Sequence, residues 1–355
     1  MPEGPEVRTF CDFLRNLFFG EAPPLLQQQH PSTSLTLNEV YIDFVNNVRH
    51  GEYFECHWSV ENIFSVGKSV YFVFNDDSGY QRLIESKFGM DGFWGFHSGS
   101  HRPDKARLVS PQVELVVRRW FSQSENSDQS TENSAIANEI SEDGTENSSE
   151  IQNQTGDTNE PIGEEFILSY YSKLNYAHGF REVSNVNRYF DLVGLALGDC
   201  EDVDYHQIAS EIIQQFSNSN KNIAQVLSSQ EVIGGIGNYI RSEAMFLASI
   251  YPYTVTRFMS IERLSEVIYC CVFVAYQSYM AGGHTVKDYL QPIIDEDGSF
   301  QQASGNYQPY CFKRNIVEIA DENNVYQSRI ITNKDNPFAK SGSKIYYCTD
   351  IQYPE

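Results

Sequence analysis

The hydrophobic period changes three times along this chain, and that order restricts the folds open to it. Residues 2–19 have apolar side chains at helical spacing, and Gly20 is a natural helix end. From about residue 36 to 119 the pattern changes to short β-rich runs separated by turn residues. The helical period returns at about residue 205, and strand-like runs return at about residue 305. This order predicts an α+β protein rather than alternating βαβ units.

Residues 122–165 differ from the rest of the chain in composition. This segment holds twelve Asp and Glu residues, no Lys or Arg and no aromatic residue. Such a segment cannot bury enough apolar surface to offset the entropy of ordering, so we expect it to be disordered. It carries about half of the net charge of −23. Because the remainder is also acidic, a nucleic-acid site would have to be a local basic patch with weak non-specific binding.

The composition excludes several classes of protein. With 355 residues, 41% of them apolar, the chain exceeds one typical domain and can bury a sizeable core. No run approaches 18 apolar residues, so we expect no membrane-spanning helix. The start MPEGPEVR has no apolar stretch typical of a signal peptide, and none of the seven cysteines forms a C-x-x-C pair. We therefore expect an intracellular protein, nuclear or cytoplasmic, with reduced thiols.

The first six residues, MPEGPE, have the groups needed for nucleophilic chemistry. Removal of Met1 would expose Pro2, whose amine has a reference pKa of about 7.7–8.0 and is partly neutral at cellular pH. A neutral amine can attack a carbonyl-like carbon and form a Schiff base, and Glu3 can donate or accept the proton. The alternative is a helix cap, because Glu and Pro are common at helix starts. On these six residues alone the cap is the simpler interpretation.

A second candidate site lies in residues 227–252, which read LSSQEVIGGIGNYIRSEAMFLASIYP. The pattern predicts a helix, a Gly-rich turn and a second helix that begins near Gly237 and Asn238. Backbone N–H groups at such a helix start suit a phosphate, and the glycines would let a phosphate backbone come close. An ordinary glycine turn between two packed helices explains the same residues equally well.

Together, the two stretches resemble the Fpg/Nei DNA glycosylases. PEGPEV and QEVIGGIGNYIRSEAMFLASIYP are similar to the family's N-terminal and helix–two-turn–helix motifs. Three further segments are similar in the expected order: GKSVYFVF (67–74), FGMDGF (88–93) and AGGHTVKDYLQ (281–291). The resemblance covers nearly the whole chain except 122–165. It implies a bifunctional DNA glycosylase/AP lyase that removes oxidised bases and nicks the strand by β/δ-elimination, with no metal or cofactor.

The resemblance implies catalytic roles for three residues. Pro2 would be the nucleophile at C1′ of the damaged nucleotide. Glu3 would be the acid/base that helps to open the sugar, and Glu6 would lie in the same pocket. The partner would be DNA with oxidised bases or abasic sites, and a monomer is the default for the family.

Three DNA contacts are implied in the same way. Lys68 and Asn238 would contact phosphates that flank the lesion, and Met90 would fill the space left by the extruded nucleotide. Taken singly, each has an ordinary alternative: a strand-edge lysine, a helix cap and a core methionine. In this combination we favour the functional interpretation of all three.

The C-terminal segment departs from the zinc finger of many family members. It contains only Cys311 and Cys348, and no histidine follows His284, whereas a structural zinc needs four ligands. We therefore expect a zincless finger and no metal. Ser343 stands where the family places an arginine that grips phosphate, and the adjacent Lys344 would replace it only as a point charge without a bidentate fork.

A second departure concerns the residues that support the opposite strand. NYAHGF (175–180) lacks the family's Arg-Arg-Phe-Gly run, and His178 and Phe180 only approximate it. Without those fillers the protein would hold the opposite strand poorly. Tolerance or preference for single-stranded or bubble DNA is therefore a hypothesis. Oxidised pyrimidines and 8-oxoguanine both stay open as lesions.

The expected organisation combines these elements into four parts. They are an N-terminal β-sandwich with the leading helix (1–121 and 166–184), an acidic disordered insertion (122–165), a helix–two-turn–helix domain (185–300) and a zincless β-hairpin finger (301–355). Two rival functions stay open: a non-catalytic damaged-DNA-binding protein on the same scaffold, and a protein-interaction role centred on the acidic insertion.

Overall fold

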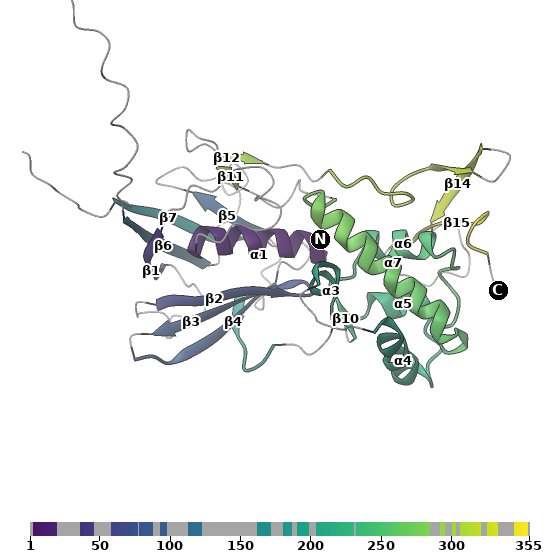
Figure 1. The fold of residues 1–355 in the computed structure, drawn as a ribbon, viewed down its shortest axis with the longest axis horizontal. Helices are drawn as coiled ribbons and strands as arrows, with labels where there is room; N and C mark the ends of the chain where they lie inside the picture. Colours follow the sequence, from purple (N-terminus) through teal and green to yellow (C-terminus); the bar gives the residue numbers. More distant parts are fainter. Residues whose placement is uncertain are drawn as a thin grey trace, which may run out of the picture.

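The computed structural model has a β-rich half and a helical half, with the helix α1 (Gly4–Phe19) reaching from one to the other (Figure 1). The α+β prediction is confirmed. Among the described residues, no helix is both long and apolar enough to cross a membrane. The structure describes residues 3–19, 36–45, 58–76, 78–87, 93–97, 113–122, 162–171, 180–186, 190–198, 204–230, 232–284, 292–294, 300–302, 306–320, 325–332 and 344–353.

The β-rich half is one antiparallel sheet in the order β5-β7-β6-β1-β2-β3-β4-β8. Its strands are β1 (Thr36–Val45), β2 (Trp58–Val66), β3 (Ser69–Asp76), β4 (Gln81–Lys87), β5 (Phe93–His97), β6 (Val113–Ser122), β7 (Ile162–Tyr171) and β8 (Phe180–Glu182). Within the described strands, β1 and β2 pair only at Ile42 and Trp58. The two halves of the sheet separate there and lie as two layers beside α1 in Figure 1.

The core of this half lies between α1 and both layers. Phe10 of α1 stacks on Trp94 of β5 at 6.3 Å between ring centroids, and Trp94 also contacts Phe72 of β3 at 6.0 Å. The apolar residues expected on one face of the helix are therefore its buried face. The arrangement agrees with the expected β-sandwich. The buried side chains are Val7, Phe10, Cys11, Leu14, Phe18, Val60, Ile63, Val70, Phe72, Phe74, Ile84, Trp94, Leu168 and Tyr170.

The strands β6 and β7 extend further than the sequence predicted. They pair from Val113 with Tyr170 to Phe121 with Ile162. The first four residues of β7 therefore belong to the segment that we expected to be disordered to residue 165. Strand pairing accounts for this difference, because the register of β7 with β6 continues without a break from Phe166 opposite Val117 to Ile162 opposite Phe121. Residues 123–161 of the predicted insertion lie outside the described residues.

The helical half surrounds a long central helix. Its elements are β9 (Phe190–Asp191), α3 (Leu192–Leu197), α4 (Tyr205–Phe216), α5 (Ile223–Ser228), β10 (Ile233–Gly234), α6 (Asn238–Leu247), the 3₁₀ turn η2 (Thr256–Phe258) and α7 (Ile261–Met280). Ser260 caps α7 by accepting a hydrogen bond from the Arg263 N–H. α7 packs against α3, α4 and α6, and Tyr279 donates a hydrogen bond of 2.6 Å to Asp12 of α1. This bond ties the two halves together.

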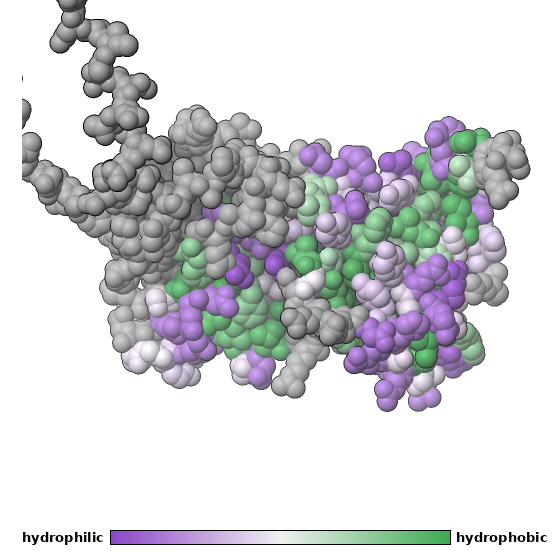
Figure 2. All heavy atoms as spheres, viewed as in Figure 1, coloured by the Kyte–Doolittle hydropathy of each residue, from purple (hydrophilic) through white to green (hydrophobic). Residues whose placement is uncertain are grey.

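The surface of the helical half follows the amphipathic pattern of its sequence. Hydrophilic residues gather over α4 in Figure 2, while Ile208, Ala209, Ile212 and Phe216 of that helix are buried. The helix has an N-cap at Asp204, whose side chain accepts from the His206 N–H at 2.8 Å.

The C-terminal segment forms two small sheets. β11 (Pro292–Ile294) pairs with β12 (Phe300–Gln302), which crosses the boundary predicted after residue 300. β13 (Ile316–Ala320), β14 (Val325–Thr332) and β15 (Tyr346–Cys348) form a three-stranded sheet, one strand more than the expected hairpin. The added strand is explained by the pairing of β14 on both sides.

The finger is joined to α6 by a buried carboxylate. Glu243 accepts hydrogen bonds from the backbone N–H groups of Tyr310, Cys311 (2.8 Å) and Phe312 (2.7 Å). Cys311 and Cys348 are buried thiols in an apolar cluster with Phe246, Val317 and Ile330. Among the described residues no group of three or more potential metal ligands was found. The absence of zinc stays a prediction.

Candidate active site

Glu3 lies at the start of α6, although the two are more than 230 residues apart in the chain. Its carboxylate accepts hydrogen bonds from the backbone N–H groups of Tyr239 (2.9 Å) and Ile240 (3.1 Å). These groups belong to the first turn of α6, where unpaired N–H groups and the helix dipole favour an anion. The side chain is only 3% exposed. The helix–turn–helix motif thus holds a carboxylate from the chain's own N-terminus.

Glycines allow this close approach. A Cβ built on Gly237 would lie 2.2 Å from Cδ of Glu3, so no larger residue fits beside the carboxylate. The Gly4 N–H donates to the Gly235 carbonyl at 2.8 Å, and Gly235 has a φ of +104°. The Gln230 side chain holds the same turn, since it accepts from the Gly235 N–H at 2.9 Å and donates to the Ile236 carbonyl at 3.0 Å. The Gly-rich turn therefore receives the start of α1.

Glu6 forms a second buried carboxylate one turn along α1. It accepts from the backbone N–H groups of Glu3 and His284, each at 2.9 Å, and from the Tyr239 hydroxyl at 3.1 Å. The Tyr239 hydroxyl also lies 2.9 Å from Oγ of Ser278 on α7. Glu6 therefore fixes the backbone of Glu3, and both carboxyl groups are held by the first turn of α6 through Tyr239 and its neighbour.

Lys68 lies in the turn between β2 and β3 and is partly buried. The preceding residue, Gly67, donates its N–H to Asp191 at 2.8 Å. The other oxygen of Asp191 caps α3 by accepting from the Gly194 N–H at 2.9 Å. One aspartate thus places the Lys68 turn against the helical half.

The charges of three of these side chains influence one another's pKa values. Burial raises the pKa of Glu3 to about 7, the nearby charge of Lys68 opposes that rise, and Glu6 adds to it. Burial also raises the pKa of Glu6. The pKa of Lys68 is lowered, mainly by burial, while Glu3 and Glu6 act in the opposite direction. A carboxyl whose pKa lies near neutrality can exist in either protonation state under cellular conditions.

Asn238 is the first residue of α6, and its carboxamide accepts a hydrogen bond from Arg241. Arg241 also donates to the Ala224 carbonyl at 3.1 Å and to the Ser228 hydroxyl of α5. A fourth contact, of 3.5 Å, reaches the Lys344 carbonyl. Burial lowers the pKa of Arg241 to about 10. This arginine orients Asn238 and joins α5, α6 and the finger.

The structure brings together four of the seven residues expected to form the site. Glu3, Glu6 and Lys68 share one electrostatic environment, and Asn238 begins the helix that binds Glu3. Lys344 is exposed, and its backbone lies near Arg241. Three residues on which the predictions also depend, Pro2, Met90 and Ser343, lie outside the described residues, as does His178. The side chain of Phe180, the first residue of β8, is also undescribed.

Sequence reasoning missed the residues that hold the site in place. Arg241 follows Asn238 by one helical turn, a spacing that places both on one side of the helix and offered a usable signal. Asp191 gave no such signal, because it lies 124 residues from Gly67. Nothing in the sequence distinguishes Tyr239 from a core aromatic residue, and only its contacts identify it as a partner of Glu6.

Comparisons with known proteins agree with this geometry. No family model matches the chain. A formamidopyrimidine-DNA glycosylase of Roseobacter denitrificans is 31% identical over 104 residues, which are 29% of this chain and 36% of that protein. One from Janthinobacterium is 34% identical over 109 residues, covering 30% and 37%. The matches thus span about a third of the length of these curated relatives.

Solved structures extend the likeness over the whole chain. MutM (Fpg) from Thermus thermophilus has a TM-score of 0.54 at 15% identity, covering 99% of this chain and 98% of that one. A complex of Lactococcus lactis Fpg with DNA containing an abasic site has a TM-score of 0.55 at 13% identity, covering 99% and 100%. The TM-scores show that the fold is shared, and at such low sequence identities the likeness extends to the fold alone.

The chain is thus similar in sequence to formamidopyrimidine-DNA glycosylases over about a third of their length, and it shares the fold of the Fpg structures. The Fpg/Nei resemblance seen in the separate sequence stretches is therefore confirmed. The hydrogen bonds between Glu3 and the start of α6 join the two most specific of those stretches in space.

Proposed function

We propose that this protein is a DNA glycosylase with AP lyase activity, acting on DNA that contains damaged bases or abasic sites. The observation that carries the proposal is the buried Glu3 carboxyl at the start of α6, with a pKa of about 7 and Lys68 nearby. The proposal is also supported by relatives named as glycosylases and by Fpg structures with damaged or abasic-site DNA.

In the proposed reaction, the amine of Pro2, freed by removal of Met1, attacks C1′ of the damaged nucleotide. The new N–C1′ bond replaces the glycosidic bond, whose electron pair leaves with the base, and the base gains the proton that the Pro2 nitrogen loses. The C1′–O4′ bond then breaks, O4′ takes the proton of Glu3, and an iminium forms between Pro2 and C1′. Loss of a proton from C2′ expels the 3′ phosphate, and a second elimination expels the 5′ phosphate. The iminium is the electron sink, so the scheme requires no metal or diffusible cofactor.

The remaining residues would position the DNA. Lys68 and Asn238 would bind phosphates that flank the lesion, and Met90 would occupy the space of the extruded nucleotide. Lys344 would supply a point charge from the finger. Glu6 would keep Glu3 in place through its bond to the Glu3 N–H. The protein would act as a monomer, and a preference for single-stranded or bubble DNA stays a hypothesis.

Borohydride trapping tests the chemistry directly. The wild type, Pro2→Gly and an N-terminally blocked form are incubated with single-stranded and duplex oligonucleotides that contain an abasic site. We expect a covalent adduct that depends on a free Pro2, because borohydride reduces the iminium to a stable amine. Correctly processed protein that binds the DNA but gives no adduct would favour the non-catalytic DNA-binding alternative.

A further inference from the structure

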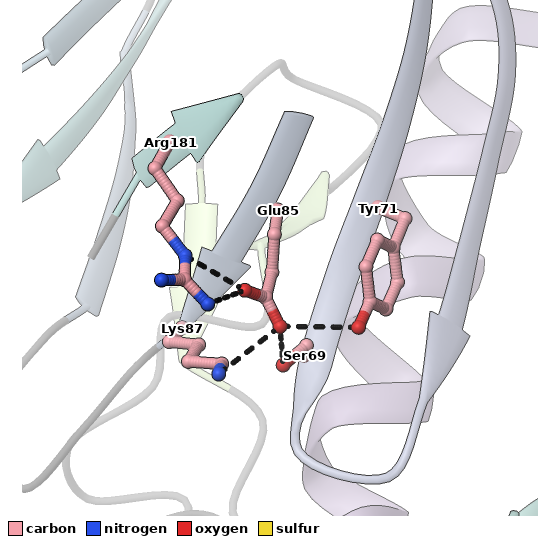
Figure 3. A network of polar contacts seen from close by, with 5 residues as sticks. All are labelled: Ser69, Tyr71, Glu85, Lys87 and Arg181. Atoms are coloured by element: carbon pink, nitrogen blue, oxygen red, sulfur yellow. Dashed lines mark hydrogen bonds and ion pairs between the residues drawn. The ribbon is translucent and has the colours of Figure 1, made fainter. Parts of the chain in front are cut away.

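A second buried carboxylate lies on β4, on the face of the sheet opposite the α1 core (Figure 3). Glu85 is 1% exposed, and one of its oxygens accepts from the hydroxyls of Ser69 (2.9 Å) and Tyr71 (3.0 Å). Lys87 lies 3.2 Å from the same oxygen. Arg181 of β8 donates to the other oxygen through Nε (3.1 Å) and Nη2 (2.9 Å). The carboxylate therefore has partners on both oxygens.

This cluster presents fixed cations at the surface. Burial tends to raise the pKa of Glu85, but the hydrogen bonds from Arg181 and Ser69 and the charge of Lys87 outweigh it, and the pKa is lowered. One ionised carboxylate thus faces two cations, which leaves one net positive charge. The side chains of Arg181 and Lys87 are 43% and 41% exposed, whereas the carboxylate is hidden beneath them.

Strand register places the cluster at the same end of the sheet as Lys68 of the candidate active site. Lys87, the last residue of β4, pairs with Ser69, which directly follows Lys68 in the chain. Arg181 pairs with Glu85 in the neighbouring strand β8. Arg181 therefore lies at the same end of the sheet as Lys68, two strands further out. Neighbouring strands are about 4.7–4.9 Å apart, so the two cations fall within the length of a short DNA segment.

The contacts fix one edge of the guanidinium and leave another for a ligand. The two hydrogen bonds from Arg181 to Glu85 use Nε and Nη2, and the remaining nitrogen points away from Glu85 in Figure 3. An arginine held in this way loses little further side-chain entropy when it binds an anion. Because the chain has a net charge of −23, a polyanion such as DNA can be attracted only by local positive sites of this kind.

We propose that Arg181, oriented by Glu85, binds a phosphate of the DNA backbone outside the Lys68 contact. This inference deepens the proposed function, since it rests on DNA as the partner, but it does not depend on the Pro2 chemistry. Glu85 is a positioning residue in this scheme. A purely structural ion pair that fastens β8 to β4 is the alternative to be tested.

The test measures the Kd of full-length protein for duplex DNA with a stable tetrahydrofuran abasic analogue over a range of salt concentrations. Arg181→Gln should weaken binding several-fold and reduce the slope of log K against log salt by about 0.9, the value for one phosphate contact. Arg82→Gln is the matched control, because Arg82 lies on the same strand as Glu85 and pairs with Glu182 of β8 at 3.0 Å. It removes the same charge and should leave the slope unchanged.

Glu85→Gln gives the sharper result, because general electrostatic attraction and the orientation of Arg181 by Glu85 predict changes in Kd of opposite sign. The substitution adds one net positive charge, so general electrostatic attraction would tighten DNA binding. If Glu85 orients Arg181, binding weakens despite that added charge, and Arg181→Lys gives an intermediate Kd with the wild-type salt slope. Thermal unfolding at the assay pH checks that each variant is folded.

Two outcomes overturn the inference: equal effects of Arg181→Gln and Arg82→Gln on the salt slope, or tighter binding by folded Glu85→Gln. Borohydride trapping by the wild type separates this failure from that of the proposed function. Protein that forms the adduct but shows no Arg181-dependent slope refutes the phosphate contact alone. Protein that shows the slope but forms no adduct retains the contact and refutes the lyase chemistry.

Discussion

Glu3 and Glu85 are both almost completely buried, yet their pKa values move in opposite directions. Glu3 has two backbone N–H donors, Lys68 acts on it through its nearby charge, and burial raises its pKa to about 7. Glu85 has two hydroxyl donors and direct contacts with Arg181 and Lys87, and its pKa is lowered. Burial alone therefore does not decide the charge of a carboxyl group in this protein. The set of donors around it does.

This contrast separates two kinds of task. A carboxyl that changes protonation near neutral pH is suited to proton transfer, whereas one that stays ionised is suited to holding cations. Glu3 has the first property and lies beside the residue that we propose as nucleophile. Glu85 has the second and lies beneath two exposed cations. The predictions below test whether the difference persists in function.

The largest effect is expected on turnover. Glu3→Gln should lower kcat on a damaged-base duplex by at least about 10²-fold, because general acid–base groups contribute about 10²–10⁴-fold. Glu85→Gln should raise KM and leave kcat within about twofold, since a positioning residue for a phosphate contact acts on binding. Steady-state kinetics on the two variants provide the measurement. A similar loss of kcat in both would remove the distinction.

The pH dependence of kcat/KM should follow Glu3 and not Glu85. Activity requires the Glu3 proton, which is lost as pH rises through about 7, and a neutral Pro2 amine, which forms as pH rises through about 7.7–8.0. The profile should therefore be a bell with its maximum between these values. Glu3→Gln should abolish the alkaline limb, and Glu85→Gln should keep the wild-type shape. An unchanged alkaline limb in Glu3→Gln would exclude Glu3 as the acid.

Stability should depend on pH with opposite signs at the two sites. The folded pKa of Glu3 is raised, so its contribution is present below about 4.5 and is lost as pH rises through about 7, by at most about 3 kcal/mol. The folded pKa of Glu85 is lowered, so its contribution is present above the unfolded value and is lost as pH falls through the folded pKa.

Thermal unfolding between pH 3 and pH 8 measures these contributions. Glu3→Gln should flatten the loss of Tm on the alkaline side, and Glu85→Gln should flatten the loss on the acid side. Identical pH dependence in both variants would contradict the opposite pKa shifts. Glu61→Gln, at an exposed position on β2, is the control for removal of a surface carboxylate.

The smallest effect is expected from a change far from both carboxylates. Removing residues 124–160 and joining the ends with a short Gly/Ser turn should leave kcat, KM and Tm nearly unchanged. The segment connects β6 and β7 where Phe121 pairs with Ile162, at the end of the strands opposite the Tyr170 contact with the Lys87 carbonyl. Loss of turnover in a folded deletion variant would instead assign the acidic segment a part in activity.

The sequence was sufficient to predict the order of elements, and four of the residues that it singled out, Glu3, Glu6, Lys68 and Asn238, lie close together in the structure. Helical spacing predicted α1 and the start of α6 closely, because apolar residues and capping positions are local properties of the chain. The roles expected for Glu3 and Asn238 rested on motifs, and the structure places both at the start of α6. The roles of all seven site residues stay predictions, those of Pro2, Met90 and Lys344 included.

The supporting contacts could not be predicted, for a physical reason. Arg181 lies 96 residues from Glu85, and both follow strand patterns in which a charged residue ordinarily faces water. Only the pairing of β4 with β8 brings the two residues together. In that arrangement the Glu85 carboxylate is buried, whereas the Arg181 side chain is exposed. Residues 162–165 were assigned to the disordered segment because of its acidic composition, whereas the structure includes them in strand β7.

Helix α6 interacts with other parts of the chain through two carboxyl groups, one bound at its first turn and one on its own Glu243, and this has a consequence for how the fold can evolve. Its first turn receives Glu3, and its Glu243 receives the backbone of residues 310–312. The finger is thereby fastened by main-chain groups that every amino acid except proline provides. Side chains inside the finger can therefore be exchanged over generations, metal ligands included, while the Glu3 carboxyl at the start of α6 keeps its position.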